Sequence, residues 1–319
     1  MKKLRVGVIG VGYLGKFHAE KYARMDNVEL VGVVDVNGDQ AREVAQKIGT
    51  TAYSDYRDLF GKVDAVSVVV PTPGHFDVGR AFLDHDVDVL IEKPITTTVE
   101  EADSLIRLAD SRGLILQVGH LERFNPAVAA LEDIITVPRF IESHRLSLFK
   151  PRGIDVSVVL DLMIHDIDII LNFVKSEIVD IRAAGTTVIT HEVDIANARL
   201  EFQNGCVANV TASRISTKNE RKIRLFQKDA YISVDFANHE ITVVRQSQNG
   251  GDGIIPGMEL NRLCFTKGDA LEAEIKAFVS SVISRSTPEV SGKVGRDALK
   301  IALSIMDQIN STHHRFLNA

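Results

Sequence analysis

Two groups of side chains in this 319-residue sequence have the types and spacing needed to move protons and stabilise charge. The first group is Lys93, in the run Glu92-Lys93-Pro94. Proline disfavours the α region for the residue before it, so we expect Lys93 in a stiff, extended turn. There its ammonium group can polarise a substrate oxygen, because a lysine pKa can fall from about 10.4 toward a catalytic range. The alternative is a solvated lysine at a strand end.

The second group is Asp161 and His165, in a stretch that predicts a largely buried helix. Residues four apart share a helix face, so this carboxylate and imidazole are neighbours. Histidine titrates near neutral pH, which makes His165 the natural general base, with Asp161 supporting the imidazolium. The alternative is a core pair that only satisfies itself and nearby backbone. Asp166 and Asp168 point to other faces and are interpreted as capping, pairing or solvent-facing residues.

Three glycines, Gly10, Gly12 and Gly15, follow an apolar run at G-x-G-x-x-G spacing and open a helical pattern that includes Tyr13 and Leu14. This order is typical of a dinucleotide site. The first glycine allows a tight turn, the second leaves room for a pyrophosphate, and the third lets the helix approach the strand. The N–H groups at the helix N-terminus then hold the phosphates.

Asp35 lies twenty residues after Gly15, at the end of a second apolar run, 28–34. A carboxylate there accepts hydrogen bonds from the ribose 2′-hydroxyl of NAD and repels the 2′-phosphate of NADP. No arginine follows it directly, so the sequence favours NAD. The alternative is that Asp35 caps a helix predicted from about Asp39.

The elements that must position these groups alternate through the first part of the chain. Apolar runs predict strands at 4–9, 28–34, 65–70, 88–91 and 114–118, with helices near 14–25, 39–48, 55–60, 75–85 and 99–112. Continuous apolar strands are typical of a parallel sheet buried on both faces. We therefore predict an α/β fold whose domain 1–120 is a Rossmann doubly wound parallel sheet, with ligands at the carboxyl ends of its strands.

Residues 121–319 show a different pattern and predict an α+β domain for substrate binding and oligomerisation. Helices are expected near 126–133, 156–174, 270–286 and 295–316, and strands at 139–148, 179–189, 194–202, 206–214, 222–228, 231–235 and 240–245. The stretch 246–268 is interpreted as a long loop. A mostly antiparallel sheet with one helix-covered face leaves the other face open, so we expect a homo-oligomer, a dimer or tetramer, through that face.

Composition excludes several classes of protein. The net charge of −6 argues against a nucleic-acid partner. Cys206 and Cys264 form no metal or disulfide framework and are expected in the core. We expect no metal. No apolar run approaches the roughly 20 residues that span a bilayer. The first apolar run, the predicted six-residue strand 4–9, is too short to be the apolar region of a signal peptide. We therefore expect a cytoplasmic protein without membrane contact.

Together, the glycine motif, the acid after the second strand, Glu-Lys-Pro and D-x-x-x-H resemble the Gfo/Idh/MocA oxidoreductases over essentially the whole chain. That resemblance implies an NAD(P)-dependent dehydrogenase of a sugar, an inositol or a related compound. It implies that Lys93, Asp161 and His165 are catalytic and also contact the substrate. The segments expected to border the cofactor contain Thr72, Pro73, His75, Glu92 and Lys93, and the segment entering the second domain contains Arg123 and Asn125, expected to bind substrate.

Within this family, residues 119–126 and 161–168 are similar to those of members that oxidise the 3-hydroxyl of UDP-N-acetylglucosamine on the route to amide-linked lipid A. A UDP-sugar carries a diphosphate, so cations are expected in the substrate domain. The candidates are Arg123, Arg145, Lys150, Arg152, Arg214, Lys218, Arg221 and Lys222. The alternative is that they are solvated surface charges, which we expect for most of them; we favour Lys150 and Arg152 as the diphosphate ligands. The alternatives are another sugar, inositol or nucleotide sugar, a reductase working in the opposite direction, and a non-catalytic NAD-dependent sensor.

Overall fold

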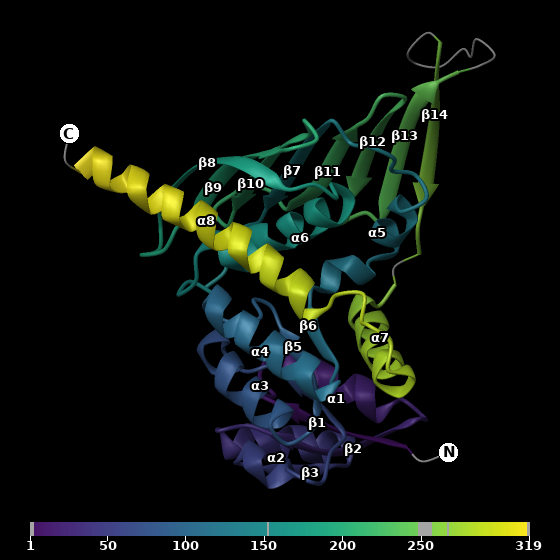
Figure 1. The fold of residues 1–319 in the computed structure, drawn as a ribbon, viewed down its shortest axis with the longest axis vertical. Coiled ribbons are helices and arrows are strands. Elements are labelled where there is room, and N and C mark those ends of the chain that lie inside the picture. Colours follow the sequence, from purple (N-terminus) through teal and green to yellow (C-terminus); the bar gives the residue numbers. More distant parts are fainter. Residues whose placement is uncertain (1–2, 152, 248–256, 267, 318–319) are drawn as a thin grey trace. The chain divides into compact units, whose positions relative to one another are not determined.

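The computed structural model describes residues 3–151, 153–247, 257–266 and 268–317, and the side chains of these up to 312 (Figure 1). The chain forms two compact units. The first combines Met1–Phe124 with Asp269–Leu299, and the second combines Asn125–Gly268 with Lys300–Ala319. The sequence predicted one boundary, after residue 120, and so placed 269–299 in the second domain. That segment instead packs in the first unit, where Leu271, Ile275 and Phe278 share a core with Val6 and Val8.

The first unit contains a six-stranded parallel sheet in the order β3-β2-β1-β4-β5-β6. Its strands are β1 Leu4–Ile9, β2 Val28–Val34, β3 Thr51–Tyr53, β4 Ala65–Val68, β5 Asp88–Glu92 and β6 Leu116–Gly119. This is the strand order of a dinucleotide-binding fold and confirms the predicted Rossmann sheet. Strand β3 was not predicted, because its three residues are too few to show a period.

Helices cover both faces of this sheet. They are α1 Gly15–Ala23, α2 Gly38–Ile48, α3 His75–Leu83, α4 Val99–Arg112 and α7 Ala270–Ser284, with short 3₁₀ turns η1 Tyr56–Leu59, η2 Thr72–Gly74 and η3 Leu121–Phe124. Helix α1 packs against both α2 and α7, and α3 packs against α4 (Figure 1). The predicted capping box at the start of α4 is present, since Thr98 accepts from the Glu101 N–H and the Glu101 carboxylate accepts from the Thr98 N–H.

The second unit contains an eight-stranded sheet in the order β14-β13-β12-β11-β7-β10-β9-β8. Its strands are β7 Phe140–Leu146, β8 Ile178–Thr186, β9 Ile195–Phe202, β10 Val207–Ser213, β11 Glu220–Phe226, β12 Ala230–Asp235, β13 Glu240–Gln246 and β14 Met258–Cys264. Among the described strands of this eight-stranded sheet, only the β7–β10 pair is parallel. The predicted mostly antiparallel sheet is therefore confirmed.

Strand β14 lies inside the stretch 246–268 that was predicted to be a loop, so that prediction was wrong. It pairs with β13 at the edge of the sheet, and most of its side chains are exposed. Such a strand shows no alternation of buried and polar residues, which is why the sequence hides it. The same strand corrects a second prediction: Cys264 is exposed, whereas Cys206 is buried as expected.

The helices of the second unit are α5 Pro126–Leu131, the π-helical turn η4 Val159–Met163, α6 Ile164–Phe173 and the part of α8 Gly292–Leu317 that follows Leu299. Helices α6 and α8 lie on one face of the sheet (Figure 1). Gln308 of α8 anchors that packing, because its side chain accepts from the Ala183 N–H at 3.0 Å and donates to the Ile181 carbonyl at 2.5 Å. Along β9 and β10 buried side chains alternate with more exposed ones. The buried set faces these helices, so the more exposed set faces away from them.

Among the helices described here, none has both the length and the apolar character required to cross a bilayer.

Candidate cofactor site and active site

The three glycines of the motif have the geometry that their spacing predicts. Gly10 has φ +84°, a conformation that favours glycine. A Cβ at Gly15 would lie 1.8 Å from the Gly10 carbonyl oxygen, so the helix reaches the strand only because this side chain is absent. A Cβ at Gly12 would meet nothing within 4 Å, which leaves open space beside the turn. Helix α1 begins there without a side-chain cap, so its first turn offers backbone N–H groups to an anion.

A groove of 590 Å³ lies beside this turn, at the carboxyl ends of β1, β2 and β4. Its lining residues are Ile9, Gly10, Gly12, Val34, Asp35, Val36, Ser54, Tyr56, Val69, Val70, Pro71, Gly74 and Val78. Its walls are largely apolar, as expected for a site that holds a flat heterocycle and uses few polar groups to orient it. The sequence analysis missed Ser54 and Tyr56, because both follow β3, the strand that it did not find.

Asp35 lies at the edge of this groove and is held by backbone donors. One carboxylate oxygen accepts from the Val11 N–H and the other from the Asn37 N–H, both at 2.9 Å. The alternative role as a helix cap is wrong, since Asn37 is the N-cap of α2 and that helix begins at Gly38. The carboxylate is therefore fixed at the position where a ribose hydroxyl donates in this fold.

The segment after β4 contributes unevenly to the groove. Pro71 and Gly74 line it, whereas Thr72 and Pro73 do not, so a direct cofactor contact by these two stays a prediction. His75 is buried, and its ring nitrogens each lie 2.8 Å from a backbone carbonyl oxygen, those of Pro94 and Val70. Burial lowers the pKa of this imidazole. A neutral imidazole carries one N–H, so His75 donates to one of these two carbonyls and packs the turn after β4 against the loop after β5.

Lys93 follows β5 and is half-buried, and the peptide bond from Lys93 to Pro94 is cis. Next to it in the first unit is His120, which follows β6 and is 1% exposed. Burial, then the positive charges of Lys93 and Arg123, lower the pKa of His120 to about 3. His120 is therefore a neutral imidazole close to two cations. Sequence reasoning missed it, although its place directly after a strand of the parallel sheet was the available signal.

Arg123 and Asn125 were both predicted to bind substrate. Arg123 is buried within η3, and its Nη2 atom lies 3.7 Å from a Glu289 carboxylate oxygen. Asn125 is the N-cap of α5, where its side-chain oxygen accepts from the Ala127 N–H at 3.0 Å. That hydrogen bond gives Asn125 a structural role. Contact of either residue with substrate stays a prediction.

Asp161 and His165 lie on the predicted helix of the second unit. Asp161 is in the π-helical turn η4 and His165 is in α6, and both are half-buried, whereas Met163 and Ile164 between them are buried. Single π-turns occur frequently at functional sites. Gly153 lies close to the Asp161 carboxylate, since a Cβ built on this glycine would be 3.4 Å from Asp161 Oδ2.

Asp166 and Asp168, which follow on the same helix, are both 1% exposed, so the solvent-facing interpretation is wrong for them. Asp166 forms a two-pronged ion pair with Arg145, with Nε–Oδ2 at 3.0 Å and Nη2–Oδ1 at 2.8 Å. The pairing interpretation is confirmed for Asp166. Arg145 is consequently a support for the helix rather than the diphosphate ligand that the sequence suggested.

Arg214 is a second predicted cation with a structural role. It is 5% exposed and donates to the carbonyl oxygens of Gly153 and Val156, which fixes the loop before the helix. Lys218 pairs with Glu220. Lys150 is exposed on the same loop, and Arg152 lies outside the described residues. Of the favoured pair Lys150 and Arg152, only Lys150 is therefore among the residues that the structure describes.

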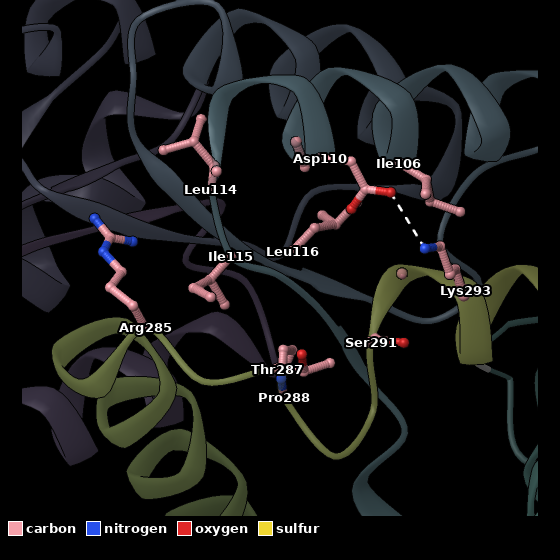
Figure 2. Close-up of a pocket in the computed structure, with 13 residues that line it drawn as sticks. Ile106, Asp110, Leu114, Ile115, Leu116, Arg285, Thr287, Pro288, Ser291 and Lys293 are labelled. Atoms are coloured by element: carbon pink, nitrogen blue, oxygen red, sulfur yellow. Dashed lines mark ion pairs between the residues drawn. The ribbon is translucent and has the colours of Figure 1, made fainter.

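A second groove in the first unit, of 380 Å³, runs between the end of α4 and the segment 285–293 (Figure 2). Asp110 and Lys293 pair across it at 3.2 Å, and Arg285 on its wall also pairs with Asp88 at 2.7 Å. It borders Leu116, the first residue of β6. Ligands of doubly wound sheets bind at the other end of the strands, so this groove is not the cofactor site.

Comparison with known proteins agrees with this geometry. Residues 4–120 match the "Oxidoreductase family, NAD-binding Rossmann fold" of the Gfo/Idh/MocA group, and residues 141–233 match its C-terminal domain. The chain is 41% identical over 306 residues to a UDP-N-acetylglucosamine 3-dehydrogenase of Acidithiobacillus ferrooxidans, covering 96% of this chain and 97% of that protein. The chain belongs to the Gfo/Idh/MocA family.

The solved structure of that A. ferrooxidans enzyme superimposes with a TM-score of 0.93 at 40% identity, covering 98% of this chain and 99% of the other. A myo-inositol 2-dehydrogenase of Thermotoga maritima is more distant, at 28% identity over 93% of each chain. As a member of this family the protein is an NAD-binding oxidoreductase, which confirms the predicted enzyme class and cofactor. The glycine turn, the groove and Asp35 fit NAD, as described above.

Proposed function

We propose that this protein oxidises the 3-hydroxyl of UDP-N-acetylglucosamine to the 3-keto sugar, with NAD as hydride acceptor. The observation that supports this substrate most strongly is the 41% identity, along nearly the whole length of both chains, to an enzyme of that name. The identity to the inositol dehydrogenase is much lower over a similar span.

In the proposed mechanism, Lys93 and His165 act on the same hydroxyl group. His165 accepts the hydroxyl proton on an imidazole nitrogen while the C–H electron pair leaves as hydride. NAD, when bound, supplies the electrophilic ring carbon that takes this hydride. The ammonium group of Lys93 stabilises negative charge that develops on the oxygen, an interaction stronger in the transition state than in the ground state. Asp161 orients the imidazole and stabilises its charged form.

The chain's own residues would also bind both ligands. The N–H groups at the start of α1 hold the cofactor phosphates and Asp35 accepts from the ribose hydroxyl. Lys150, exposed on the loop that Arg214 fixes, and Arg152 next to it contribute positive charge toward the sugar diphosphate. Arg123 and Asn125 belong to the segment proposed to contact the sugar.

The wider setting follows from the same proposal. We propose that the 3-keto product is the substrate of an aminotransferase that installs a 3-amino group, on the route to amide-linked lipid A in the cytoplasm. We further propose a homo-oligomer formed through the face of the eight-stranded sheet that α6 and α8 leave uncovered, because large exposed sheet faces are commonly buried between subunits.

Steady-state turnover with a panel of substrates tests the proposal. The purified protein is mixed with NAD and either UDP-N-acetylglucosamine, UDP-glucose, free N-acetylglucosamine or myo-inositol, and NADH formation is followed. We expect kcat/KM for UDP-N-acetylglucosamine to exceed that for myo-inositol by about 10⁴-fold. A site built to bind particular polar groups of its substrate rejects an analogue that lacks those groups, because its own polar groups are then left unpaired. Reduction of the product with borodeuteride should place deuterium on C3. Preferred turnover of myo-inositol, or NAD binding without any turnover, would contradict the proposal.

A further inference from the structure

A chain of buried polar side chains lies in the first unit between the sheet and helices α1 and α7. It runs through Tyr22, Ser67, His18, Glu92 and Glu274, all 0% exposed except Glu92, which is 9% exposed. The imidazole and carboxylate atoms of His18, Glu92 and Glu274 lie within 4.8 Å of one another. Glu92 directly precedes Lys93, so this series of polar side chains includes a residue of the turn that carries the proposed catalytic lysine.

The hydrogen bonds of this chain have a consistent direction. His18 Nε2 lies 3.1 Å from Glu92 Oε1, and an ionised carboxylate only accepts, so the hydrogen is on Nε2. In a neutral imidazole Nδ1 then accepts, and it lies 3.2 Å from the Ser67 hydroxyl. The Tyr22 hydroxyl donates to the same Ser67 oxygen at 2.8 Å. Every group up to Glu92 is thereby satisfied.

Glu274, on α7, lies at the end of this chain. Among the described residues neither of its carboxyl oxygens has a hydrogen-bond partner, although the side chain is fully buried. Burial, and then the negative charge of Glu92, raise the pKa of Glu274 well above its usual value. Two neighbouring buried carboxylates cannot both ionise at low cost, so one of them keeps its proton.

The elements packed around Glu274 contribute few charges. Helix α1 contributes His18 and Tyr22, and its Lys21 pairs with Asp269 and Glu272 on α7. Strand β5 contributes Glu92, and β6 contributes the neutral Gln117, whose amide donates to the Glu274 backbone carbonyl at 3.3 Å. The turn η3, which also packs on α7, carries Glu122 and Arg123.

We propose that Glu274 is a neutral positioning residue: its protonated carboxyl, which has an oxygen within 4.8 Å of a Glu92 carboxylate oxygen, offers that carboxylate a donor and so positions the Glu92-Lys93-Pro94 turn. The neighbouring strand leaves little freedom for this turn, because a Cβ at Gly119 would lie 2.8 Å from the Glu92 carboxyl group. The effect on Lys93 rests on the function proposed above, whereas the protonation of Glu274 does not.

Two variants of Glu274 separate its proton from its volume. Glu274→Gln keeps the shape and a hydrogen-bond donor, and Glu274→Leu fills the space without one. Glu272→Gln, on the exposed side of the same helix, is the matched control. Infrared spectra of the folded wild-type protein at neutral pH should show a protonated carboxyl band that Glu274→Gln lacks and Glu272→Gln keeps. Absence of that band from the wild type would overturn the proposal.

Thermal unfolding provides a second readout that does not depend on activity. The raised folded-state pKa means that the unfolded chain releases the proton first, so the carboxyl's contribution is present at low pH and lost as pH rises. We expect the wild type to lose stability relative to Glu274→Gln between about pH 5 and pH 8, above the unfolded glutamate pKa of about 4.3. A stability difference between wild type and Glu274→Gln that stays constant from pH 5 to pH 8 would show that the pKa of the Glu274 carboxyl is not raised and would contradict the proposal.

Turnover tests the positioning role. Glu274→Leu should lower kcat by about tenfold while the Kd for NAD stays within about threefold, because a displacement of one ångström can cost up to about 10²-fold in rate. Glu274→Gln should restore kcat. A kcat for Glu274→Leu equal to wild type would refute the positioning role. If the wild type turns over none of the substrates, the proposed function fails while the spectra and unfolding data still test the proton.

Discussion

The two units bury their ionisable side chains in different ways. In the first unit the pKa shifts of three buried side chains favour the neutral form: His75, His120 and Glu274. In the second unit Arg145 and Asp166 are buried as an ion pair, and Asp194 is surrounded by donors that favour its ionised form. Burying an isolated ion costs several kcal/mol, so a partner or a proton must offset that cost. At these six residues the second unit supplies partners and the first unit favours the neutral form, although Asp88 of the first unit is also buried and pairs with Arg285.

The reason for the difference lies in the neighbouring elements. In the second unit, Arg145 of β7 lies beside Asp166 of α6, and the backbone of 188–190 points three N–H groups at Asp194. In the first unit, the buried imidazole of His120 lies near cations and the carboxyl of Glu274 near another carboxyl, so in each case the neighbours favour the neutral form. The Arg145–Asp166 ion pair therefore holds the proposed catalytic helix, whereas in the first unit the neutral His120 lies close to the Lys93 and Arg123 cations.

Breaking the buried ion pair is the strongest test of this contrast. Arg145→Leu leaves Asp166 ionised and buried without its partner, so the free energy of unfolding should fall by about 3–5 kcal/mol. Urea unfolding followed by circular dichroism measures it. The double variant Arg145→Leu, Asp166→Leu should recover most of the loss, because no lone charge remains. An Arg145→Leu variant as stable as the wild type would show that the ion pair with Asp166 does not stabilise the fold.

Asp194→Asn tests the second buried ion. Burial raises the pKa of Asp194, but N–H donors at 188–190 and the Thr190 hydroxyl outweigh it and lower the pKa to about 2. The amide loses the charge-assisted bonds, so stability at neutral pH should fall by about 2 kcal/mol. Because the folded-state pKa is depressed from 3.8, this contribution is complete above that value and lost as pH falls through about 2. A wild-type advantage that grows in acid would contradict this assignment.

Asp35 sharpens the comparison, because it is the half-buried acid of the first unit that faces the groove. The pair of changes Asp35→Ser and Val36→Arg should weaken NAD binding by about tenfold, or 1.4 kcal/mol, and strengthen NADP binding. Val36 is 98% exposed, so Val36→Arg alone is the control for folding. Titration calorimetry with both cofactors measures the change. An unaltered preference for NAD would exclude Asp35 as the selecting group.

The smallest effect at neutral pH is expected for His120→Gln, about 1 kcal/mol, because both side chains are uncharged there. In acid, the free energy of unfolding of the wild type and of His120→Gln should change with pH at different rates. The folded-state pKa of His120 is lowered from 6.5 to about 3, so its contribution is complete above 6.5 and lost as pH falls toward 3. The stability gap should therefore close in acid, measured by unfolding at a series of pH values. A gap independent of pH would mean that His120 is not the buried neutral base described here.

Much of the first unit was predictable, because its strands are buried on both faces and its turns carry glycines and caps. The bounds of β1 and β2 and the capping box of α4 agree with the sequence. Strands β3 and β14 were missed, the first for its length and the second for its exposure. The return of 269–299 to the first unit has no local signal, since an apolar helix fits either core.

The candidate site divides in the same way. Lys93, Asp161 and His165 were predicted to be catalytic from residue type, spacing and the family resemblance, which are properties of the sequence, and that role stays a prediction. His120 and Glu274 were not, because their significance comes from burial beside particular charges, and burial depends on tertiary packing. Arg145 and Arg214 were candidate diphosphate ligands in the sequence, and their burial could not be predicted for the same reason.

The central claim is that Lys93 of one unit and His165 of the other act on one hydroxyl. Turnover of Lys93→Met, His165→Ala and the double variant tests it most directly, with NAD affinity measured in parallel. We predict that each single change lowers kcat by about 10²-fold or more without changing the Kd for NAD. We predict that the double variant is less than about tenfold slower than the slower single variant, because groups that act as a unit are not additive. Losses that multiply, or a His165→Ala variant with wild-type turnover, would contradict the account.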